Sequence, residues 1–597
     1  MSLKSGQLEL PTALAGIRPV QVKGSKWKRH VTAVLLIAAA ASILVPMITR
    51  GGDAIAQART GTGTGTTTKS GSQIHACNQL PPLSPSGPPA SFESDSIFRF
   101  AALGRLSGAV QIQTVSFDNM TNVPPQNGGD EIHAQFKVFH NYLEAVFPLV
   151  HKNLKKTVIN EYSLLFTWEG KNKDDKPLVL MAHQDVVPVL PETLNQWTHP
   201  PFSGFIDEEN GRLWGRGAGD TKATLFGTLE AVEQLLKSGF VPNRSVYLAY
   251  GHDEEISGHQ GAKRIAQYLE NDLNLKGKLG LLIDEGPGFD VRDDVHLAAV
   301  GTGEKGYVDV SVTVETKGGH SSVPPKHTGI GLSALLIAEL ESNPYPISLS
   351  DNNPLLGATK CYAQHSKHAD PSIQKALDHL NNGGREKLAK LLASTNEVFE
   401  SLLGTTQAVD VINGGLKVNA LPEKVTTVIN HRIAVDSSLK GTQDHIYSVL
   451  KKVVKNYALN LTVVDFTSLN GNDVAYEIGV AHAIGKVTVE PAFPGLEPSP
   501  TSPSNGDKDL GWNVLEGTIH HVYDKSKGGE TGSVVVGPSI MPGNTDTRHY
   551  WGLGKSIYRF APIDGANAHT VDEYVVIDGY IQAIRFYHEL IRNWSEA

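Results

Sequence analysis

Four short polar motifs in this 597-residue chain combine imidazole and carboxylate groups. His183 and Asp185 are two residues apart, so the ring can bind a metal ion while the carboxylate orients it by hydrogen bonding. Asp220 ends the glycine-rich stretch WGRGAGD, which permits a close backbone approach. Glu254 and Glu255 are adjacent, which is useful when one carboxylate binds a cation and its neighbour transfers protons.

Asp284 closes the fourth motif, at the end of the apolar run LLI, where a carboxylate needs a partner, a cation or water. Each motif alone has an ordinary structural explanation: a surface turn at His183, a helix cap at Asp220 or a solvated turn at Glu254. Together, the motifs favour a shared site, because three of them close predicted strands and Asp220 opens the helix between them.

Alternating strands and helices are expected to position these motifs. Apolar runs at 178–182, 245–250 and 279–283 predict strands, and apolar spacing over 97–106, 131–151 and 223–238 predicts helices. This alternation indicates an α/β fold, with a mixed sheet flanked by helices. Ligand sites in such sheets gather beyond the carboxyl ends of the strands, which is where the motifs fall.

The pattern changes at about residue 305. Strands are predicted at 307–316, 408–412, 426–434 and 461–465, with helices at 330–340 and 443–457. Two strand-helix-strand halves of this size predict a small α+β domain inserted into the first domain. We therefore expect a catalytic domain formed by residues 97–304 and 468–597, and an inserted domain at 305–467.

The N-terminal region predicts a membrane anchor. Residues 31–49 (VTAVLLIAAAASILVPMIT) lack charges and are long enough to cross a bilayer. Basic residues precede this run, so residues 1–30 are expected in the cytoplasm and the body in a vacuolar or lysosomal lumen or outside the cell. A cleaved signal peptide and a buried core helix are the alternatives. Residues 50–96, rich in Gly, Thr, Ser and Pro, are expected to form a flexible stalk.

Composition narrows the class of protein. A chain with 40% hydrophobic and 19% charged residues is typical of an ordered globular body. The net charge of -9, without a basic stripe, argues against nucleic acid as a partner. Cys77 and Cys361 are the only cysteines, so a cysteine-rich zinc module is excluded and at most one intrachain disulfide can form. Four sequons permit glycosylation: Asn119, Asn243, Asn460 and Asn593.

Other enzyme classes fit the motifs less well. The stretch GRGAGD lacks the third glycine of a dinucleotide-binding loop, and its aspartate would repel a pyrophosphate. The stretch GLGKS lacks the first glycine of a phosphate-binding loop. The chain contains no Gly-x-Ser-x-Gly motif, which removes the simplest serine hydrolase interpretation.

As a set, the motifs resemble those of the co-catalytic zinc exopeptidases, which include carboxypeptidase S, glutamate carboxypeptidase and the aminoacylases. The resemblance covers about residues 98–597 and is greatest for the carboxypeptidase S-like members. It rests on the stretches MAHQDVVPV, WGRGAGDTKATL, GHDEEISG, LIDEGPG, KGGHSSVPP, KVNALPEK, NTDTRHY and NAHTVDEYV.

This resemblance implies two zinc ions per chain. His183 and Asp284 would hold one ion, Glu255 and His569 the other, and Asp220 would bridge them. Three carboxylates and two imidazoles also suit zinc, which prefers oxygen and nitrogen ligands. A pair of zinc ions about 3.5 to 4 Å apart can share one water as a bridging hydroxide.

The remaining catalytic roles also follow from the resemblance. Asp185 would orient His183, and Glu254 would be the general base. The inserted domain would be a lid, with His320 reaching the scissile carbonyl oxygen. In dimeric relatives this histidine comes from the partner subunit, so a homodimer through the lid is an alternative to action within one chain. The long polar stretch 352–406 departs from the shorter lid of those relatives.

Arg548 in NTDTRHY matches a family position near the substrate carboxylate, which a guanidinium can bind through two hydrogen bonds. Asn419 and Arg432 are further candidates for the same pocket. We therefore expect a carboxypeptidase that hydrolyses the C-terminal amide bond of short or N-blocked peptides. A hydrolase of N-acyl amino acids is the alternative, since both substrates present an amide and a carboxylate, and an inactive lumenal binding protein is a third hypothesis.

Overall fold

The computed structural model describes residues 77–597, except residues 89, 121–130, 396, 469–470, 472, 507–508 and 530–531. The expected cytoplasmic tail, the expected membrane helix at 31–49 and the first part of the expected stalk lie outside the described residues. Within the described part of the chain, no helix combines the length and the apolar run that crossing a membrane requires.

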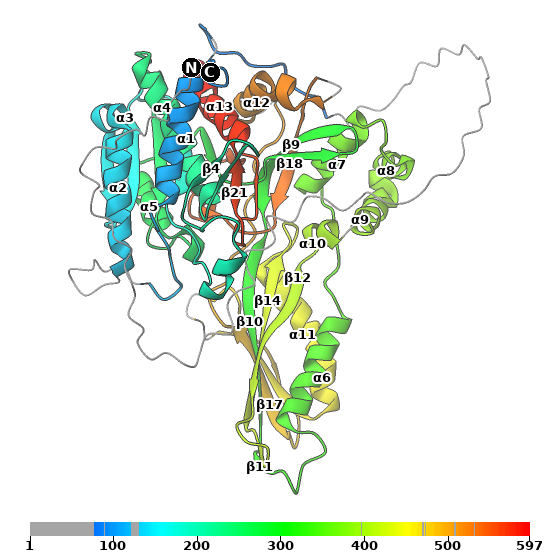
Figure 1. Cartoon of the computed structure of the whole chain (residues 1–597). Coiled ribbons are helices and arrows are strands. Elements are labelled where there is room, and N and C mark those ends of the chain that lie inside the picture. The colour runs from blue at the N-terminus through cyan, green and yellow to red at the C-terminus, as the bar shows by residue number, and fades with distance from the viewer. Residues whose placement is uncertain are drawn as a thin grey trace, which may run out of the picture. The chain divides into compact units, whose positions relative to one another are not determined.

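A nine-stranded mixed sheet forms the larger part of the fold (Figure 1). Its order is β1-β2-β6-β3-β7-β19-β9-β18, with β8 paired to β9. The three strands that carry polar motifs, β6, β3 and β7, are neighbours and run parallel. The strands are β1 Lys155–Ile159, β2 Ser163–Trp168, β3 Leu178–His183, β6 Val246–Gly251, β7 Leu281–Asp284, β8 Phe289–Arg292, β9 Val295–Glu304, β18 Val535–Met541 and β19 Ile557–Arg559.

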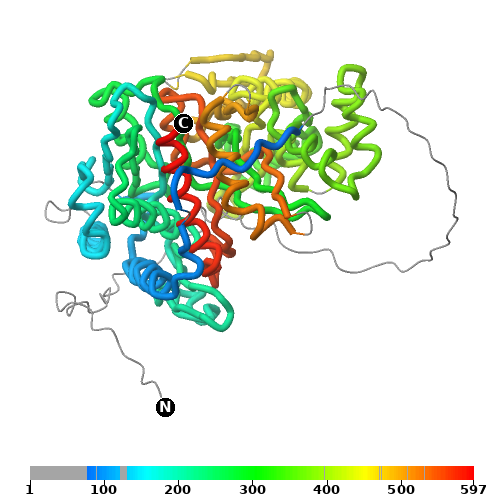
Figure 2. The backbone as a smooth tube through the Cα atoms, turned by 90° about the horizontal axis from the view of Figure 1, so that it is seen from above, coloured from blue at the N-terminus to red at the C-terminus, as the bar shows by residue number. Residues whose placement is uncertain are grey.

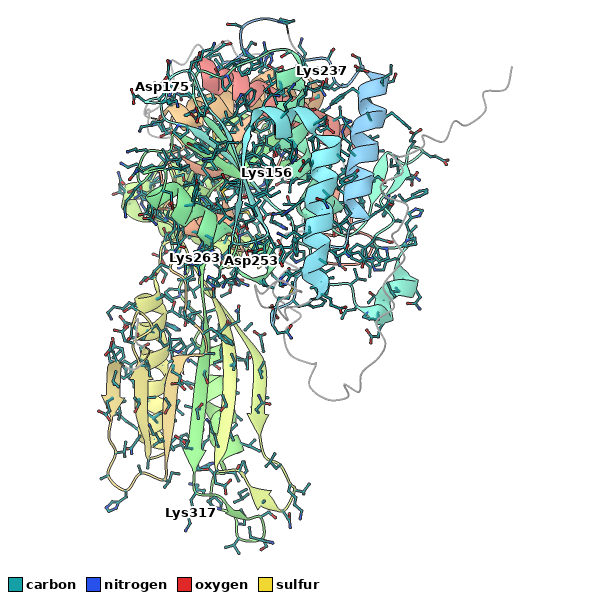
Figure 3. All side chains as sticks on the ribbon, turned by 90° about the vertical axis from the view of Figure 1, so that its left-hand side faces the viewer. Lys156, Asp175, Lys237, Asp253, Lys263 and Lys317 are labelled. Atoms are coloured by element: carbon teal, nitrogen blue, oxygen red, sulfur yellow. A yellow bond between two sulfur atoms is a disulfide. The ribbon has the colours of Figure 1, made fainter. Side chains whose placement is uncertain are left out.

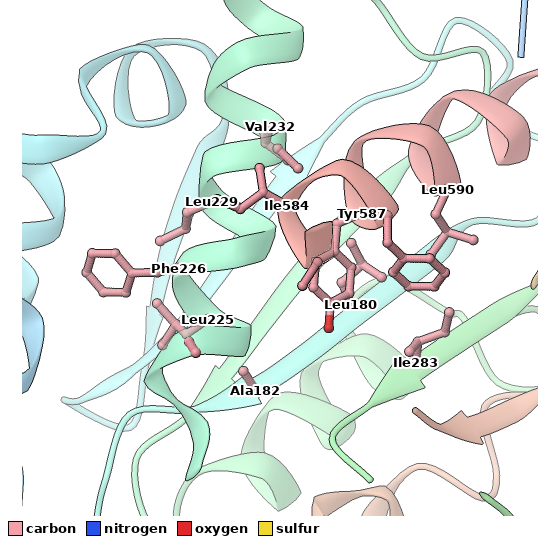
Figure 4. Packing of buried hydrophobic residues seen from close by; sticks show 14 of the residues in the cluster. Leu180, Ala182, Leu225, Phe226, Leu229, Val232, Ile283, Ile584, Tyr587 and Leu590 are labelled. Atoms are coloured by element: carbon pink, nitrogen blue, oxygen red, sulfur yellow. The ribbon is translucent and has the colours of Figure 1, made fainter. Parts of the chain in front are cut away.

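Helices cover both faces of this sheet, which explains why its central strands are almost wholly apolar. Leu180 and Ala182 of β3 pack against α4 (Ala223–Lys237) and α13 (Ile577–Glu596), as Figure 4 shows. The alternate residues Val179 and Met181 pack with α5 (Ala262–Asn271) on the other face. The expected α/β architecture is confirmed. Further helices are α1 Ser96–Val110, α2 Ala134–Val146, α3 Pro148–Asn153 and α12 Leu510–Lys527.

A small four-stranded sheet, in the order β20-β21-β5-β4, joins two distant segments of the chain. Trp214 pairs with Tyr574, so the segment that leads to Asp220 lies beside the segment that follows His569. The strands are β4 Phe205–Asp207, β5 Arg212–Trp214, β20 Gly565–Ala566 and β21 Tyr574–Val576.

The inserted domain contains a six-stranded sheet in the order β12-β14-β10-β17-β15-β16, packed with α6 and α11 around its own core. The sheet continues past residue 467, where we expected the domain to end, because β16 and β17 also belong to it. Both strands are short and mix polar with apolar residues. The elements are β10 Gly306–Thr316, α6 Gly329–Ser342, β12 Thr406–Gly414, β14 Lys424–Ile433, α11 Leu439–Asn456, β15 Leu459–Val464, β16 Val474–Ile478 and β17 Gly485–Pro491.

Four helices occupy most of the polar stretch 352–406. The first, α7, packs against β9 and β18 of the nine-stranded sheet. The approach is close, because a Cβ atom added to Gly357 would lie 2.6 Å from Pro538 Cγ. This stretch, expected within the lid, therefore packs against the edge of the nine-stranded sheet. The helices are α7 Pro354–His365, α8 Pro371–Leu377, α9 Arg385–Ala393 and α10 Glu397–Leu403.

The last part of the expected stalk lies on the body (Figure 2). Cys77 forms a disulfide with Cys361 of α7, so the two cysteines are paired. Leu83 N donates to Gly517 O of α12 at 2.8 Å, and Asn593 Nδ2 of α13 donates to Leu83 O at 2.9 Å. The stretch rich in Gly, Ser and Pro was expected to be flexible. For residues 77–88 this expectation is wrong, because hydrogen bonds to these two helices hold the backbone in place.

Candidate active site

Three parallel strands deliver the polar motifs to one edge of the nine-stranded sheet. His183 ends β3 and pairs in register with Gly251, the last residue of β6. Glu254 and Glu255 follow the end of β6 after two intervening residues, and Asp284 is the last residue of β7. The expected convergence of these motifs arises because parallel strands present their carboxyl ends at the same edge of a sheet.

Asp220 lies between two imidazole rings. His183 Nε2 is 3.1 Å from Asp220 Oδ1, and His569 Nε2 is 2.9 Å from Asp220 Oδ2. Glu255 Oε2 is 3.1 Å from the same nitrogen of His569. Burial lowers the pKa of His569, but its contacts with Asp220 and Glu255 outweigh burial and raise the pKa to about 11. The structure thus brings together four of the five expected metal ligands.

The donor set fits a metal site. Among the described residues, Glu255 Oε1 and His569 Nδ1 are buried and have no hydrogen-bond partner. Such atoms are costly to bury unless something binds them. Two groups could each hold a metal ion, with donor atoms all within 4.8 Å of one another: His183, Asp220 and Glu255, and His183, Glu254 and Glu285. Oxygen and nitrogen donors of this kind suit zinc.

Glu285, rather than the expected ligand Asp284, belongs to one of these two groups. Glu285 Oε2 lies 3.5 Å from His183 Nε2. In the β3–β7 register Leu180 pairs with Ile283, so Asp284 lies two residues below the level of His183 and Glu285 lies nearer to it. The LLIDEGPG motif contained both acids, but the sequence could not fix this register.

Asp185 connects the ring of His183 to the turn that carries the paired glutamates. His183 Nδ1 hydrogen-bonds with the backbone O of Asp185 at 2.9 Å and lies 3.3 Å from its Oδ1. The two carboxylate oxygens accept the backbone N–H groups of Glu254 and Glu255, each at 3.1 Å. Ser116 Oγ donates to Asp185 Oδ2 at 2.7 Å. Asp185 is fully buried, so these contacts fix the orientation of the ring.

Glu254 lies in a strongly acidic environment. Burial raises its pKa well above the usual range for a glutamate, and the negative charge of Glu285 adds to this effect. A carboxyl group with a raised pKa can take and return a proton near neutral pH. This environment suits a general base, the role expected for Glu254.

Two arginines approach each other where the inserted domain meets the catalytic domain. Burial lowers the pKa of Arg432 in β14, and the positive charge of Arg548 contributes to this shift. Arg432 NH1 lies 3.5 Å from Asn544 Oδ1. Among the described residues, the buried Nε of Arg548 has no hydrogen-bond partner. Two expected carboxylate-binding residues are therefore near enough to interact electrostatically, and Asp309 and Asp410 also act on Arg432.

His320 and Asn419 lie elsewhere, at the far end of the inserted domain. His320 belongs to β11 (Gly319–His320), which pairs with β13 (Ala420–Leu421) directly after Asn419. Strand β10 leads away from the nine-stranded sheet for 11 residues before reaching this tip. At about 3.3 Å per residue this is a distance of about 35 Å. Figure 3 shows Lys317 at the same tip, remote from Asp253.

Glu573 is a buried carboxylate near the site that the sequence did not single out. It lies four residues after His569, in the stretch NAHTVDEYV, and is wholly buried. Its contacts are made to the loop that carries Asp220. The available signal was a charged residue directly before an apolar strand, which needs a partner when buried.

Comparisons with known proteins agree with this geometry. Residues 179–593 match the family described as Peptidase family M20/M25/M40. The chain is 40% identical to carboxypeptidase S from Saccharomyces cerevisiae over 87% of its length and 89% of that protein. It is 32% identical to the N-fatty-acyl-amino acid synthase/hydrolase PM20D1 from Bos taurus, covering 85% of this chain and 90% of that protein.

Solved structures share the fold at low sequence identity. The dipeptidase Dug1p from Saccharomyces cerevisiae superimposes with a TM-score of 0.54 at 14% identity, covering 85% of this chain and 98% of that one. Human carnosine dipeptidase 1 also has a TM-score of 0.54, at 12% identity, covering 85% of this chain and 100% of that one.

Proposed function

Because this chain belongs to peptidase family M20/M25/M40 and is a metallo-exopeptidase, we propose that it uses two zinc ions to hydrolyse the C-terminal amide bond of short or N-blocked peptides. The observation that carries this proposal is the position of Asp220 between the rings of His183 and His569. A carboxylate with one oxygen directed at each of two imidazoles suits a ligand shared by two metal ions.

The side chains divide into two metal-binding sets around Asp220. His183 and Glu285 would hold one ion, and Glu255 and His569 the other. This assignment replaces Asp284 with its neighbour. When bound, the ions would polarise the scissile carbonyl and lower the pKa of water.

Glu254 would take the proton from the attacking water and return it to the leaving amine. Its acidic, buried surroundings support this role because they raise the pKa of its carboxyl group. Asp185 holds the backbone of Glu254 and the ring of His183 at once, which keeps the base in a fixed position relative to the metal ligands. Neither a base nor a ligand is missing from the chain, which argues against an inactive binding protein.

Arg548 and Arg432 would bind the free carboxylate at the C-terminus of the substrate. The Nε of Arg548 has no hydrogen-bond partner among the described residues, and Arg432 is within electrostatic range of it, so a substrate carboxylate would be attracted by both guanidinium groups. Fixing the carboxylate would place the last amide bond at the metal-binding side chains and would make the enzyme an exopeptidase.

An N-acyl amino acid hydrolase is the second candidate function. The similarity to the relative named N-fatty-acyl-amino acid synthase/hydrolase favours it, and such substrates offer the same amide and carboxylate. Metal analysis of the purified body, combined with a hydrolysis screen, tests both candidates. Faster turnover of acyl-Gly-Leu supports the carboxypeptidase, whereas faster turnover of long-chain N-acyl amino acids supports the alternative.

His320 would act from the partner subunit of a homodimer. The strand length places it about 35 Å along the inserted domain, beyond reach of its own metal-binding residues. Large apolar side chains are exposed near this tip, which suits a protein interface. They are Val323, Leu416 and Val418.

The body would be held in a lumen or outside the cell by the apolar run at 31–49. The disulfide between Cys77 and Cys361 supports this location, because disulfides persist in oxidising compartments. Protease treatment of sealed vesicles tests the orientation. Digestion of residues 1–30 with protection of the body is expected, and the reverse pattern would overturn the assignment.

A further inference from the structure

Glu573 lies next to the proposed metal-binding residues without belonging to them. Its side chain has no exposed surface. Oε1 accepts three backbone N–H groups: Gly217 N at 2.9 Å, Gly219 N at 3.0 Å and Asp220 N at 3.1 Å. Oε2 accepts a hydrogen bond from Arg216 NH1 at 2.7 Å. One carboxylate thus binds almost every residue of the loop that ends in Asp220.

The loop needs this support because its conformation is unusual. Gly217 has φ of 84°, in the left-handed region, and Asp220 and Thr221 depart from helical dihedral angles within the short helical turn Ala218–Lys222. His569, four residues before Glu573, also has a positive φ of 62°. Both segments carry proposed ligands. Because their backbone conformations are unfavourable, contacts from the surrounding structure must hold the two segments in position.

Glu573 joins these two segments directly. Besides the side-chain contacts, Gly215 N donates to Glu573 O at 2.8 Å. The Arg216 guanidinium that neutralises Glu573 stacks over the ring of Trp197, 5.4 Å from its centroid. A displacement of Glu573 would therefore move Asp220 and His569 relative to each other.

We propose that Glu573 is a positioning residue, which sets the distance between Asp220 and His569 and thereby the affinity for the metal pair. The proposal rests on the two-zinc function above. Residues that hold metal ligands in place typically contribute 10-fold to 100-fold in metal affinity. A buried carboxylate that bonds only backbone and arginine would otherwise serve stability alone, and the test must separate these roles.

The test compares Glu573→Gln with Glu230→Gln. Glu230 is equally buried and also pairs with an arginine, with Oε1 2.5 Å from Arg105 Nε, but it has no contact with the site. Glutamine preserves size and the acceptor for the loop, while it removes the charge and opposes Arg216 with a donor. Zinc affinity of the metal-free proteins is measured by competition with a chromophoric chelator, together with the Co(II) absorption spectrum and thermal unfolding.

Both variants are expected to lose stability. Only Glu573→Gln should bind zinc about 10-fold to 100-fold more weakly and show an altered Co(II) spectrum. Glu573→Asp, which retains the charge but not the reach, should recover part of the affinity. Equal zinc affinity in Glu573→Gln and Glu230→Gln would overturn the proposal. Failure of the wild-type protein to bind two zinc ions would instead overturn the proposed function, so the two failures are distinguishable.

Discussion

The carboxyl edge of the nine-stranded sheet and the tip of the inserted domain carry polar residues with opposite surroundings. At the sheet edge His183 is 1% exposed, and its Nε2 lies near Asp220 and Glu285, which belong to two other segments. At the tip, His320 is exposed, and Ser322, two residues away, contacts its ring. The two histidines were both expected to serve one reaction.

This difference teaches which site residues a single chain can assemble. Neighbouring parallel strands present their carboxyl ends at the same edge of the sheet, independently of the conformation of the loops. His183 and Glu255, which lie at or just after two such ends, are therefore close. A hairpin at the end of a long strand has no such constraint, because strand length carries it away from the domain that precedes it. Residues at such a tip therefore lie far from the sheet edge of their own chain.

The largest expected effect follows metal removal. Treatment with a chelator should reduce hydrolysis to background, because the buried donors around Asp220 would lose the ions that neutralise them and polarise the substrate. Added Zn²⁺ or Co²⁺ should restore the activity. Hydrolysis that persists in a preparation shown to be free of metal would contradict the assignment of the sheet edge as a metal centre.

Two neighbouring acids provide a matched control for this prediction. Glu285→Gln should bind less zinc than the wild-type protein, because Glu285 Oε2 lies near His183 Nε2. Asp284→Asn should retain its zinc, since Asp284 belongs to neither candidate group. The zinc content of both variants, measured by elemental analysis, decides whether Glu285, as the structure indicates, or Asp284, as expected from the sequence, is the ligand.

The next effect concerns the proposed general base. Glu254→Ala should lower kcat by roughly 100-fold to 10,000-fold, the usual contribution of a general base. Although Glu254 lies in one of the two candidate metal groups, zinc content should stay unchanged, because all the proposed ligands remain in this variant. Activity and metal analysis on the same preparation check this. Loss of zinc from this variant would show that the roles of Glu254 and Glu255 are exchanged.

Substitutions at the tip of the inserted domain should have a smaller effect on activity. His320→Ala is expected to lower kcat by roughly 100-fold to 1,000-fold, as loss of a donor to a developing oxyanion does, whereas Lys317→Ala at the same exposed tip should have no effect. If the histidine acts across a dimer, mixing His320→Ala with Glu254→Ala should restore about a quarter of wild-type activity through mixed dimers. Mixed dimers that form but remain inactive would place His320 within its own chain's site or outside catalysis.

Much of the fold and site could be predicted from the sequence, for physical reasons. Apolar strands that end at His183 and Asp284 identified the sheet edge, because periodicity and strand polarity are local properties. The register that favours Glu285 over Asp284 is a tertiary property and was not accessible. Nor was the packing of the stretch 352–406 accessible, because the contact of α7 with β9 and β18 is also a tertiary property.

The smallest expected effect tests whether Arg548 and Arg432, where the two domains meet, bind the substrate carboxylate. Arg548→Ala should lower kcat/KM for acyl-Gly-Leu by roughly 10-fold to 100-fold, corresponding to about 1.5 to 3 kcal/mol for a charged hydrogen bond. The same peptide with a C-terminal amide offers no charge, so wild type and variant should hydrolyse it at similar, low rates. Arg264→Ala, at an exposed position on α5, controls for loss of positive charge. Equal rates on acid and amide in the wild-type enzyme would contradict binding of the substrate carboxylate by these arginines. The reason for expecting cleavage only at the end of a peptide would then be lost.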